Sequence, residues 1–198
     1  FNVRKEYTDA TLIFIAPPSF EELERRLRSR GDTSEEQIVK RLTRAKWEIE
    51  QSVHYDHVVV NDEVDTCMNK IIEIFNSDGY DRLVILGDIL YHGPRNDLPP
   101  SYAPKKVIEA LNALADRIIA VRGNCDTEVD QMVLEFPILA DYALLYYEKK
   151  MIFVTHGHNH NTKNPPMLKK GDVLLHGHTH VPACSQEDGY TYINPGSV

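Results

Sequence analysis

Short apolar runs alternate with amphipathic stretches along most of the chain. The runs are four to six residues long or slightly shorter, which is the length of buried strands rather than of core helices. Runs of this kind lie at residues 11–16, 58–60, 82–86, 118–121, 142–147, 151–155, 173–176 and 190–193. The pair at 142–147 and 151–155 is separated by three charged residues, which predicts a hairpin.

Helical patterns lie between these runs. Ser19 and Ser34 each precede a pattern with an acidic or amide residue at the third helical position, which is typical of a capping box. The predicted helices cover about 19–30, 34–53, a stretch from 65 or 66, and 105–114, while the proline-rich stretch 97–104 predicts a loop. Strands and helices that alternate in this way predict an α/β fold.

Four of the predicted strands end in polar residues of a similar kind. The sequences are Leu-Gly-Asp at 86–88, Arg-Gly-Asn-Cys-Asp at 122–126, Thr-His-Gly-His at 155–158 and His-Gly-His-Thr-His at 176–180. Side chains that follow strands of an α/β sheet meet at the carboxyl edge of that sheet, which is where binding sites form. Asp, Asn and His together offer oxygen and nitrogen ligands that suit Mn, Fe, Zn or Mg, and a shared carboxylate would allow two metals.

Composition narrows the classes of partner. The formal net charge is −8, which argues against a protein that coats a nucleic-acid polymer, because such binding needs excess basic residues. No apolar run is long enough to span a membrane, and no basic cluster indicates a membrane anchor. Three cysteines in 198 residues are too few for a disulfide framework, so a cytoplasmic location is expected. The oligomeric state is left open.

Residues from about 69 to 198 resemble the calcineurin-like metallophosphoesterases, and within them the small bacterial YfcE-type phosphodiesterases. The resemblance is carried by segments 85–99, 102–112, 118–132, 154–158, 172–180 and 193–198. It implies a layered β-sandwich flanked by helices, and a dinuclear-type metal site at which a metal-bound hydroxide attacks phosphorus. Carried over by position, the metal ligands would be Asp88, Asn124, His156, His178 and His180, with Asp88 shared between the metals and Asn124 also stabilising the reacting group. Mn is the expected metal, with Zn, Fe or Mg as alternatives.

Two further groups lie close to these motifs in the sequence. His92 and Arg95 follow Asp88, and Arg95 could hold a substrate phosphate, although a solvated loop explains both residues equally well. Many relatives carry His where this chain has Cys125, so no general acid is assigned. His158 and His160 are expected to be solvated loop residues.

The front of the chain is similar to another family. Residues 2–65 resemble the C-terminal part of guanylate kinases, as a strand–helix–helix–strand segment that contains the lid helices of the kinase. The resemblance implies that Arg30 and Arg41 touch nucleotide phosphates and that Asn61 lies near the adenine. No Gly of this chain is followed by Lys, so the phosphate-binding loop that a kinase needs is absent.

The Asp-x-His sequence that opens the phosphoesterase family is also missing from the chain. The strand at 58–60 precedes Asp62 and a helix, which is the order the phosphoesterase needs there. This spacing gives the hypothesis that the strand completes the phosphoesterase sheet and that Asp62 becomes a metal ligand; the alternative is a capping or turn residue. The position of the lost His is taken by Val64, which cannot bind a metal.

The sequence therefore predicts a chimera-like chain with residues 1–65 as a kinase-like fragment and 66–198 as a phosphoesterase-like domain. The expected function is metal-dependent hydrolysis of a small phosphodiester or nucleotide, with impaired activity. Guanylate-kinase-type phosphoryl transfer and an inactive metal-binding chimera are the alternatives.

Overall fold

The structure is a computed structural model that describes residues 7–29, 34–90 and 102–196. Its contacts divide the chain into two compact units. One unit, called here the front unit, contains residues 10–80 and 102–107. The other, called the rear unit, contains residues 7–9, 81–90 and 108–196.

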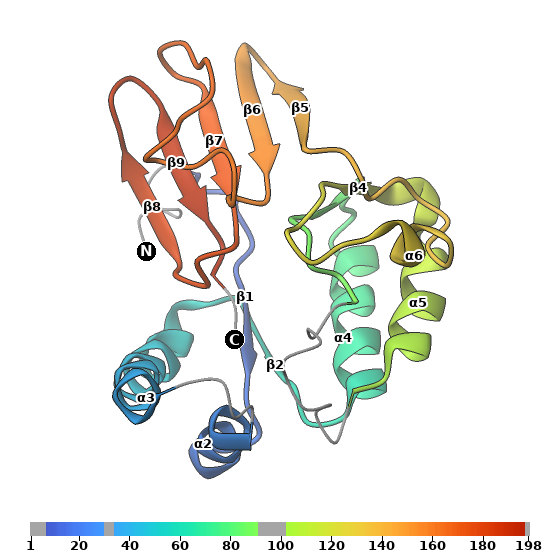
Figure 1. The fold of residues 1–198 in the computed structure, drawn as a ribbon, viewed down its shortest axis with the longest axis vertical. Helices are drawn as coiled ribbons and strands as arrows, with labels where there is room; N and C mark the ends of the chain where they lie inside the picture. Colours follow the sequence, from blue (N-terminus) through green and yellow to red (C-terminus); the bar gives the residue numbers. More distant parts are fainter. Residues whose placement is uncertain (1–6, 30–33, 91–101, 197–198) are drawn as a thin grey trace. The chain divides into compact units, whose positions relative to one another are not determined.

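The front unit begins with β1 (Ile13–Ala16), α2 (Phe20–Ser29) and α3 (Glu35–Glu50), followed by a 3₁₀ turn (Gln51–His54), β2 (His57–Val60) and α4 (Val64–Ser77). Strands β1 and β2 are parallel, with Ile13 opposite His57 and Ala16 opposite Val60. Figure 1 shows β1 and β2 together with helices α2 and α3.

The core of the front unit lies between α4 and the two strands. Its buried side chains are Val59, Cys67 and Ile74, and partly buried isoleucines of β1 and α4 pack against them. The serine caps form as the sequence predicts: Ser19 Oγ accepts the Glu22 N–H at 3.1 Å, and Ser34 Oγ accepts the Gln37 N–H at 3.4 Å. The capped helices α2 and α3 pack against each other, while α4 supplies the helical side of the core against the two strands.

The rear unit contains two sheets. Strands β3 (Leu83–Ile85) and β4 (Ile118–Ala120) form a parallel pair, and between them in sequence lie α5 (Pro104–Asn112), which crosses the unit boundary, and a 3₁₀ turn (Ala115–Arg117). After β4 comes the short α6 (Glu128–Gln131). The second sheet is built from β5 (Tyr142–Tyr147), β6 (Lys150–Thr155), β7 (Val173–His176), β8 (Ala183–Gln186) and β9 (Thr191–Asn194).

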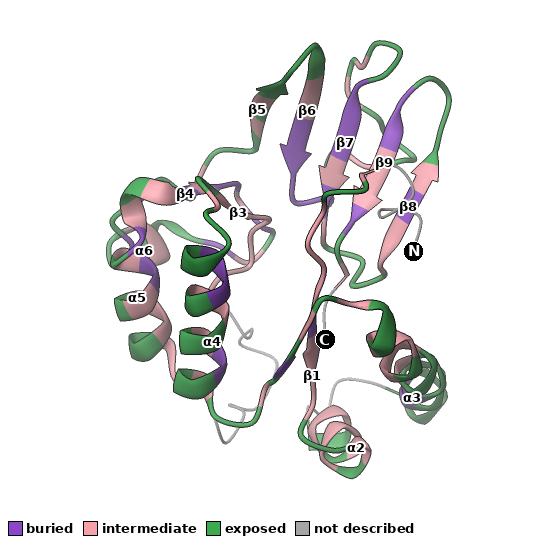
Figure 2. Cartoon of the chain, turned by 180° about the vertical axis from the view of Figure 1, so that it is seen from behind, coloured by how far each residue is buried: buried purple, intermediate pink, exposed green. Residues whose placement is uncertain are grey.

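The five strands are arranged in the order β5-β6-β7-β9-β8. The central pairs β6–β7 and β7–β9 are parallel, and the two outer pairs are antiparallel. Val154, Leu174 and Phe153 of the central strands are among the most buried residues, as Figure 2 shows for β6 and β7. Central parallel strands are covered on both faces, which explains their nearly continuous apolar sequence.

The α/β class and the layered arrangement of sheets and helices are confirmed, and so is the hairpin formed by β5 and β6. The sequence did not predict β8 or α6. Strand β8 reads Ala-Cys-Ser-Gln, without an apolar pattern of its own, and it is a strand because it pairs with β9. Helix α6 has a single turn, closed by the reciprocal cap between Thr127 and Asp130.

The junction joins two separately paired strands. Among the described residues β2 pairs with β1, and β3 pairs with β4. Pairing with β1 occupies one edge of β2, and the hypothesis that residues 58–60 complete the phosphoesterase sheet stays a prediction. Helix α4 groups with the front unit, so the contacts divide the chain at residues 80 and 81, while the domain boundary at 65 and 66 stays a prediction of the sequence.

Candidate active site

Four polar side chains meet where strands of the rear unit end. Asp88 and Asn124 follow the parallel neighbours β3 and β4, and His156 and His178 follow the parallel neighbours β6 and β7. The Nε2 atom of His156 lies 2.9 Å from Asn124 Oδ1, 3.0 Å from His178 Nδ1 and 3.3 Å from Asp88 Oδ2. The convergence expected of the strand ends is therefore present for these four residues, which we call the four-residue cluster.

The backbone that carries Asp88 turns sharply. Asp88 has φ +57° and the preceding Gly87 has φ +87°, in the left-handed region that L-residues other than Asn and Asp rarely adopt. A Cβ atom on Gly87 would lie 2.4 Å from Gly123 N, and one on Gly123 would lie 2.1 Å from Asp88 Oδ1. The loops after β3 and β4 therefore touch, and only glycine fits at both contact points.

We expect Gly123→Ala to displace Asp88 and weaken any metal bound at the cluster. The new methyl group would overlap the carboxylate and the backbone nitrogen of Asp88, and overpacking of this kind costs about 1–3 kcal/mol in free energy of unfolding. Denaturation and metal titration of the two variants Gly123→Ala and Gly171→Ala would measure this. Gly171 has φ +92° but open space, so its variant should lose stability through backbone strain and keep its metal affinity. Equal metal affinity in both variants would contradict the prediction.

Asp126 holds this pair of loops together. It is 2% exposed, and its carboxylate accepts the N–H groups of Asp88 at 2.8 Å, Ile89 at 2.9 Å and Gly123 at 2.7 Å. Asp126 lies in one of the segments that resemble the phosphoesterases, but its place in the sequence assigns it no role. The signal was a second acidic residue two positions after Asn124, which could equally have been another ligand; only the structure shows that it faces the backbone.

Hydrogen bonds fix the orientation of the cluster. His156 Nδ1 lies 2.6 Å from the carbonyl oxygen of Leu86 and can only donate to it, which directs Nε2 toward the other three residues. The Nδ2 of Asn124 donates to Cys125 Sγ at 3.1 Å, so that its Oδ1 faces His156. Asp88 Oδ1 accepts the Cys125 N–H at 2.8 Å, which leaves Oδ2 for His156.

Charges within the cluster shift the pKa values in opposite directions. Burial favours the neutral form of Asp88, but hydrogen bonds from His156 and the Cys125 N–H outweigh it, and the pKa of Asp88 is lowered. Burial also opposes the charged form of His156, but hydrogen bonds to Asp88 and the Leu86 carbonyl outweigh it, and the pKa of His156 is raised. Burial and the neighbouring His156 lower the pKa of His178. The shifts therefore favour the charged forms of Asp88 and His156 and the neutral form of His178.

The cluster has more electron-pair donors than protons. Asp88 Oδ2, Asn124 Oδ1 and His178 Nδ1 all point toward the single N–H that His156 Nε2 can offer. A histidine held by a backbone carbonyl through its other nitrogen is the usual arrangement of a metal-binding histidine. Oxygen and imidazole donors suit Mn, Fe, Zn or Mg, so the donor chemistry fits a divalent cation.

The arrangement as it stands is centred on the Nε2 atom of His156. Within the described parts of the chain, no group of three or more His, Cys, Asp or Glu side chains is positioned to hold a metal ion. In the cluster, Nε2 of His156 is the shared contact of the other three donors.

The other predicted site residues lie apart from these contacts or outside the described residues. His180 is exposed, with φ +59°, two residues after His178. Asp62 is exposed and belongs to the front unit; the next residue, Glu63, occupies the N-cap position of α4 without a capping hydrogen bond from its side chain. The roles of His180 and Asp62 as ligands stay predictions. His92 and Arg95 lie outside the described residues.

Of the three residues that the resemblance to guanylate kinases implies as nucleotide contacts, the structure describes two. Arg30 lies outside the described residues, and Arg41 is exposed on α3. Asn61 uses its backbone to join the end of β2: its N–H donates to the Ala16 carbonyl at 2.7 Å, and its carbonyl accepts from Arg26 at 3.0 Å.

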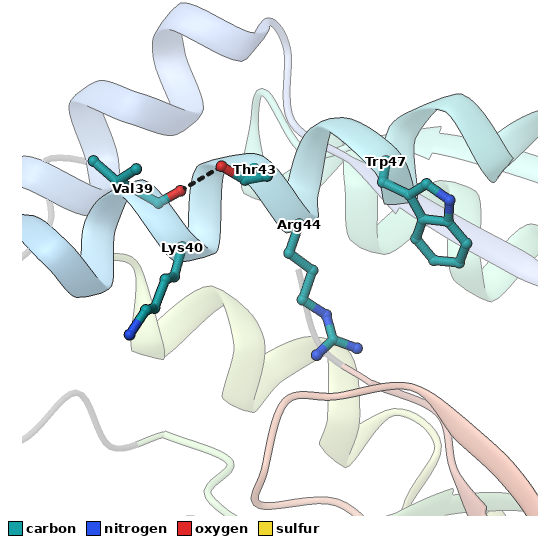
Figure 3. A pocket seen from close by; sticks show the side chains of 5 residues that line it. All are labelled: Val39, Lys40, Thr43, Arg44 and Trp47. Atoms are coloured by element: carbon teal, nitrogen blue, oxygen red, sulfur yellow. Dashed lines mark hydrogen bonds between the residues drawn. The ribbon is translucent and has the colours of Figure 1, made fainter.

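A shallow hollow lies along one face of α3, with a volume of about 470 Å³, lined by Val39, Lys40, Thr43, Arg44 and Trp47 (Figure 3). Both of its cations are paired on their own helix, Lys40 with Glu36 and Arg44 with Glu48, each at 2.7 Å. The hollow thus offers no excess positive charge to a nucleotide.

A model of the calcineurin-like phosphoesterase superfamily domain matches residues 53–198, which is most of the chain. The chain belongs to this superfamily, whose members generally depend on divalent metals. Phosphodiesterase YfcE of Escherichia coli strain K12 is 53% identical over 129 residues, which cover 65% of this chain and 70% of that protein. A solved structure titled as a characterization of YfcE, a phosphoesterase from E. coli, superposes with a TM-score of 0.62 at 52% identity, covering 66% of this chain and 71% of that one.

A guanylate kinase model matches residues 2–78. Guanylate kinase 1 of Oryza sativa subsp. japonica is 45% identical over 80 residues, and guanylate kinase of Chromobacterium violaceum is 51% identical over 72 residues. These matches span only 21% and 34% of the two kinases. The chimera-like combination is confirmed, and the two models overlap at residues 53–78, which contain β2 and α4.

No described helix combines the length and apolar character required to cross a membrane.

Proposed function

We propose that the chain hydrolyses small phosphodiesters with the help of a divalent metal, Mn²⁺ in the first place, bound at the four-residue cluster. The observation that carries the proposal is the set of three electron-pair donors that surround the Nε2 atom of His156. A cation in place of the one proton that Nε2 can carry would satisfy all four donors at once. The phosphodiesterase named among the relatives supports a phosphodiester as the substrate class.

The residues of the cluster have distinct roles in this proposal. Asp88, His156 and His178 hold the cation, and Asn124 holds it through Oδ1 and faces the phosphate as it reacts. When bound, a divalent cation supplies a hydroxide at neutral pH and neutralises charge on the phosphate oxygens. The Leu86 carbonyl keeps His156 oriented, and Asp126 keeps Asp88 in place.

The proposed centre is of the dinuclear type with one weakened position. The second position would draw on Asp88 and His180, with Asp62 as a further candidate, and it lacks the histidine of the missing Asp-x-His sequence. We therefore expect phosphodiesterase activity that needs added Mn²⁺. Its rate should be lower than the rate of a centre in which both metal positions have all their ligands.

Hydrolysis of a generic aryl phosphodiester by the purified chain tests the proposal. Turnover should require added Mn²⁺, disappear with a chelator and return when excess Mn²⁺ is restored, because the cation replaces a proton and is not permanently enclosed. The matching phosphomonoester and a guanine nucleotide serve as comparison substrates. A folded, Mn²⁺-loaded sample without turnover would contradict the enzyme and leave an inactive metal-binding chimera.

No observation in the described residues favours guanylate-kinase-type transfer. Its phosphate-binding loop is missing from the sequence, and the cations of the α3 hollow are paired with glutamates.

A further inference from the structure

The loop that carries His178 has an unfavourable backbone. His178 has φ +62° and His180 has φ +59°, so two non-glycine residues within three positions are left-handed. Such residues persist only where the surrounding structure over-determines them. The loop follows β7, which lies between β6 and β9 in the sheet (Figure 1).

Asn194, at the end of β9, is one of the residues that hold this loop, together with the His156 carbonyl, which accepts the Gly177 N–H at 2.9 Å. Its Nδ2 donates to the Gly177 carbonyl at 2.9 Å and to Thr179 Oγ1 at 3.0 Å, the residues immediately before and after His178. The same nitrogen lies 3.1 Å from the Tyr192 hydroxyl. The side chain therefore bridges both sides of His178 without touching the imidazole itself.

The carboxamide of Asn194 is itself fixed. Its Oδ1 accepts the Gly196 N–H at 2.8 Å, which leaves Nδ2 to face the histidine loop, and the residue is 2% exposed. Ala183 of β8 lies opposite Asn194, so the residue is anchored in the sheet and not in a loop. A buried amide with both ends engaged fixes the position of its partners more closely than an exposed one.

We propose that Asn194 is a positioning residue for the four-residue cluster: it holds the 177–179 backbone so that His178 Nδ1 lies next to His156 Nε2, now 3.0 Å away. Where a metal is concerned, this inference rests on the proposed function, because the cluster is proposed there as the metal site. Outer partners of metal ligands typically change metal affinity 10–100-fold when they are replaced.

The substitution Asn194→Asp tests this role with almost no change of shape. The carboxylate can still accept from Gly196, but its second oxygen would face the Gly177 carbonyl without a proton to share. We expect Mn²⁺ affinity of the full chain to fall by about 10–100-fold in calorimetric titration. The added negative charge by itself favours a cation, so a loss of affinity would report the position of the loop.

Asn112→Asp is the matched control. Asn112 makes the same pair of contacts elsewhere in the rear unit: Nδ2 donates to the Val133 carbonyl and Oδ1 accepts the Glu135 N–H, both at 3.0 Å. Its variant should lower Tm and leave Mn²⁺ affinity unchanged. Unchanged affinity in Asn194→Asp, or an equal loss in the two variants, would overturn the inference.

Two additions keep the outcome decisive. If Asn194→Asp does not fold, Thr179→Val removes the exposed acceptor Oγ1 and should lower Mn²⁺ affinity by a smaller factor; no change would count against the inference.

If the wild-type chain binds no Mn²⁺, the proposed function fails, and ¹⁵N spectra of the histidine rings in the metal-free chain then test whether Asn194 positions His178. We expect the His178 and His156 signals to shift in Asn194→Asp and to stay in place in Asn112→Asp, and unshifted signals would refute the positioning role.

Discussion

Replacing Asp88 by Asn should reduce the proposed Mn²⁺-dependent phosphodiester hydrolysis more than about 100-fold, because loss of a proposed direct ligand should exceed the 10–100-fold effect of an outer partner. The change keeps the shape of the side chain and an oxygen for the Cys125 N–H. It removes the charge that faces His156 and, with it, the interaction that raises the pKa of His156. Turnover at saturating Mn²⁺ measures the main effect.

The pKa of His156 gives an independent measure of the same change. In the metal-free chain, an NMR titration should show a lower pKa of His156 in Asp88→Asn than in the wild type, since both the hydrogen bond and the charge of Asp88 favour the imidazolium. Asp188→Asn makes the same charge change on an exposed turn between β8 and β9 and should alter neither quantity. Full activity in Asp88→Asn would exclude the cluster as the site of hydrolysis.

The second large effect is expected for Asp126→Ala, in the free energy of unfolding. One buried and two partly buried N–H groups would lose the carboxylate that accepts from them, and each unsatisfied buried group costs about 1–3 kcal/mol. We expect a total loss of roughly 3 kcal/mol or more by urea denaturation. Activity should fall as well, because two of these groups belong to Asp88 and Gly123.

Two further variants separate the hydrogen bonds from general damage. Asp126→Asn keeps one accepting oxygen and turns an NH₂ group toward the remaining N–H, so its loss should lie between wild type and Asp126→Ala. Asp130→Ala removes a partly exposed carboxylate that caps α6 through Thr127, which should cost about 1 kcal/mol in free energy of unfolding and leave activity intact. Similar losses of unfolding free energy in Asp126→Ala and Asp130→Ala would show that the three hydrogen bonds of Asp126 stabilise the loops less than their geometry implies.

The most predictable features of the chain were those that local chemistry determines. Strand runs such as residues 142–147 and caps such as Ser19 depend on neighbouring residues alone, and they appear where the sequence predicts them. The convergence of Asp88, Asn124, His156 and His178 was also predictable, because parallel strands bring their carboxyl ends to a common edge.

Tertiary structure alone decided the features that depend on partners distant in sequence. Strand β8 has no pattern of its own and forms through pairing with β9, and β2 pairs with β1 although its spacing also suited the phosphoesterase sheet. Asp126 and Asn194 could have faced a ligand or the backbone equally well from their spacing. The backbone groups they satisfy belong to other strands and loops, up to 38 residues away for Asp126 and 17 for Asn194, and such a choice is made only when the strands are packed together.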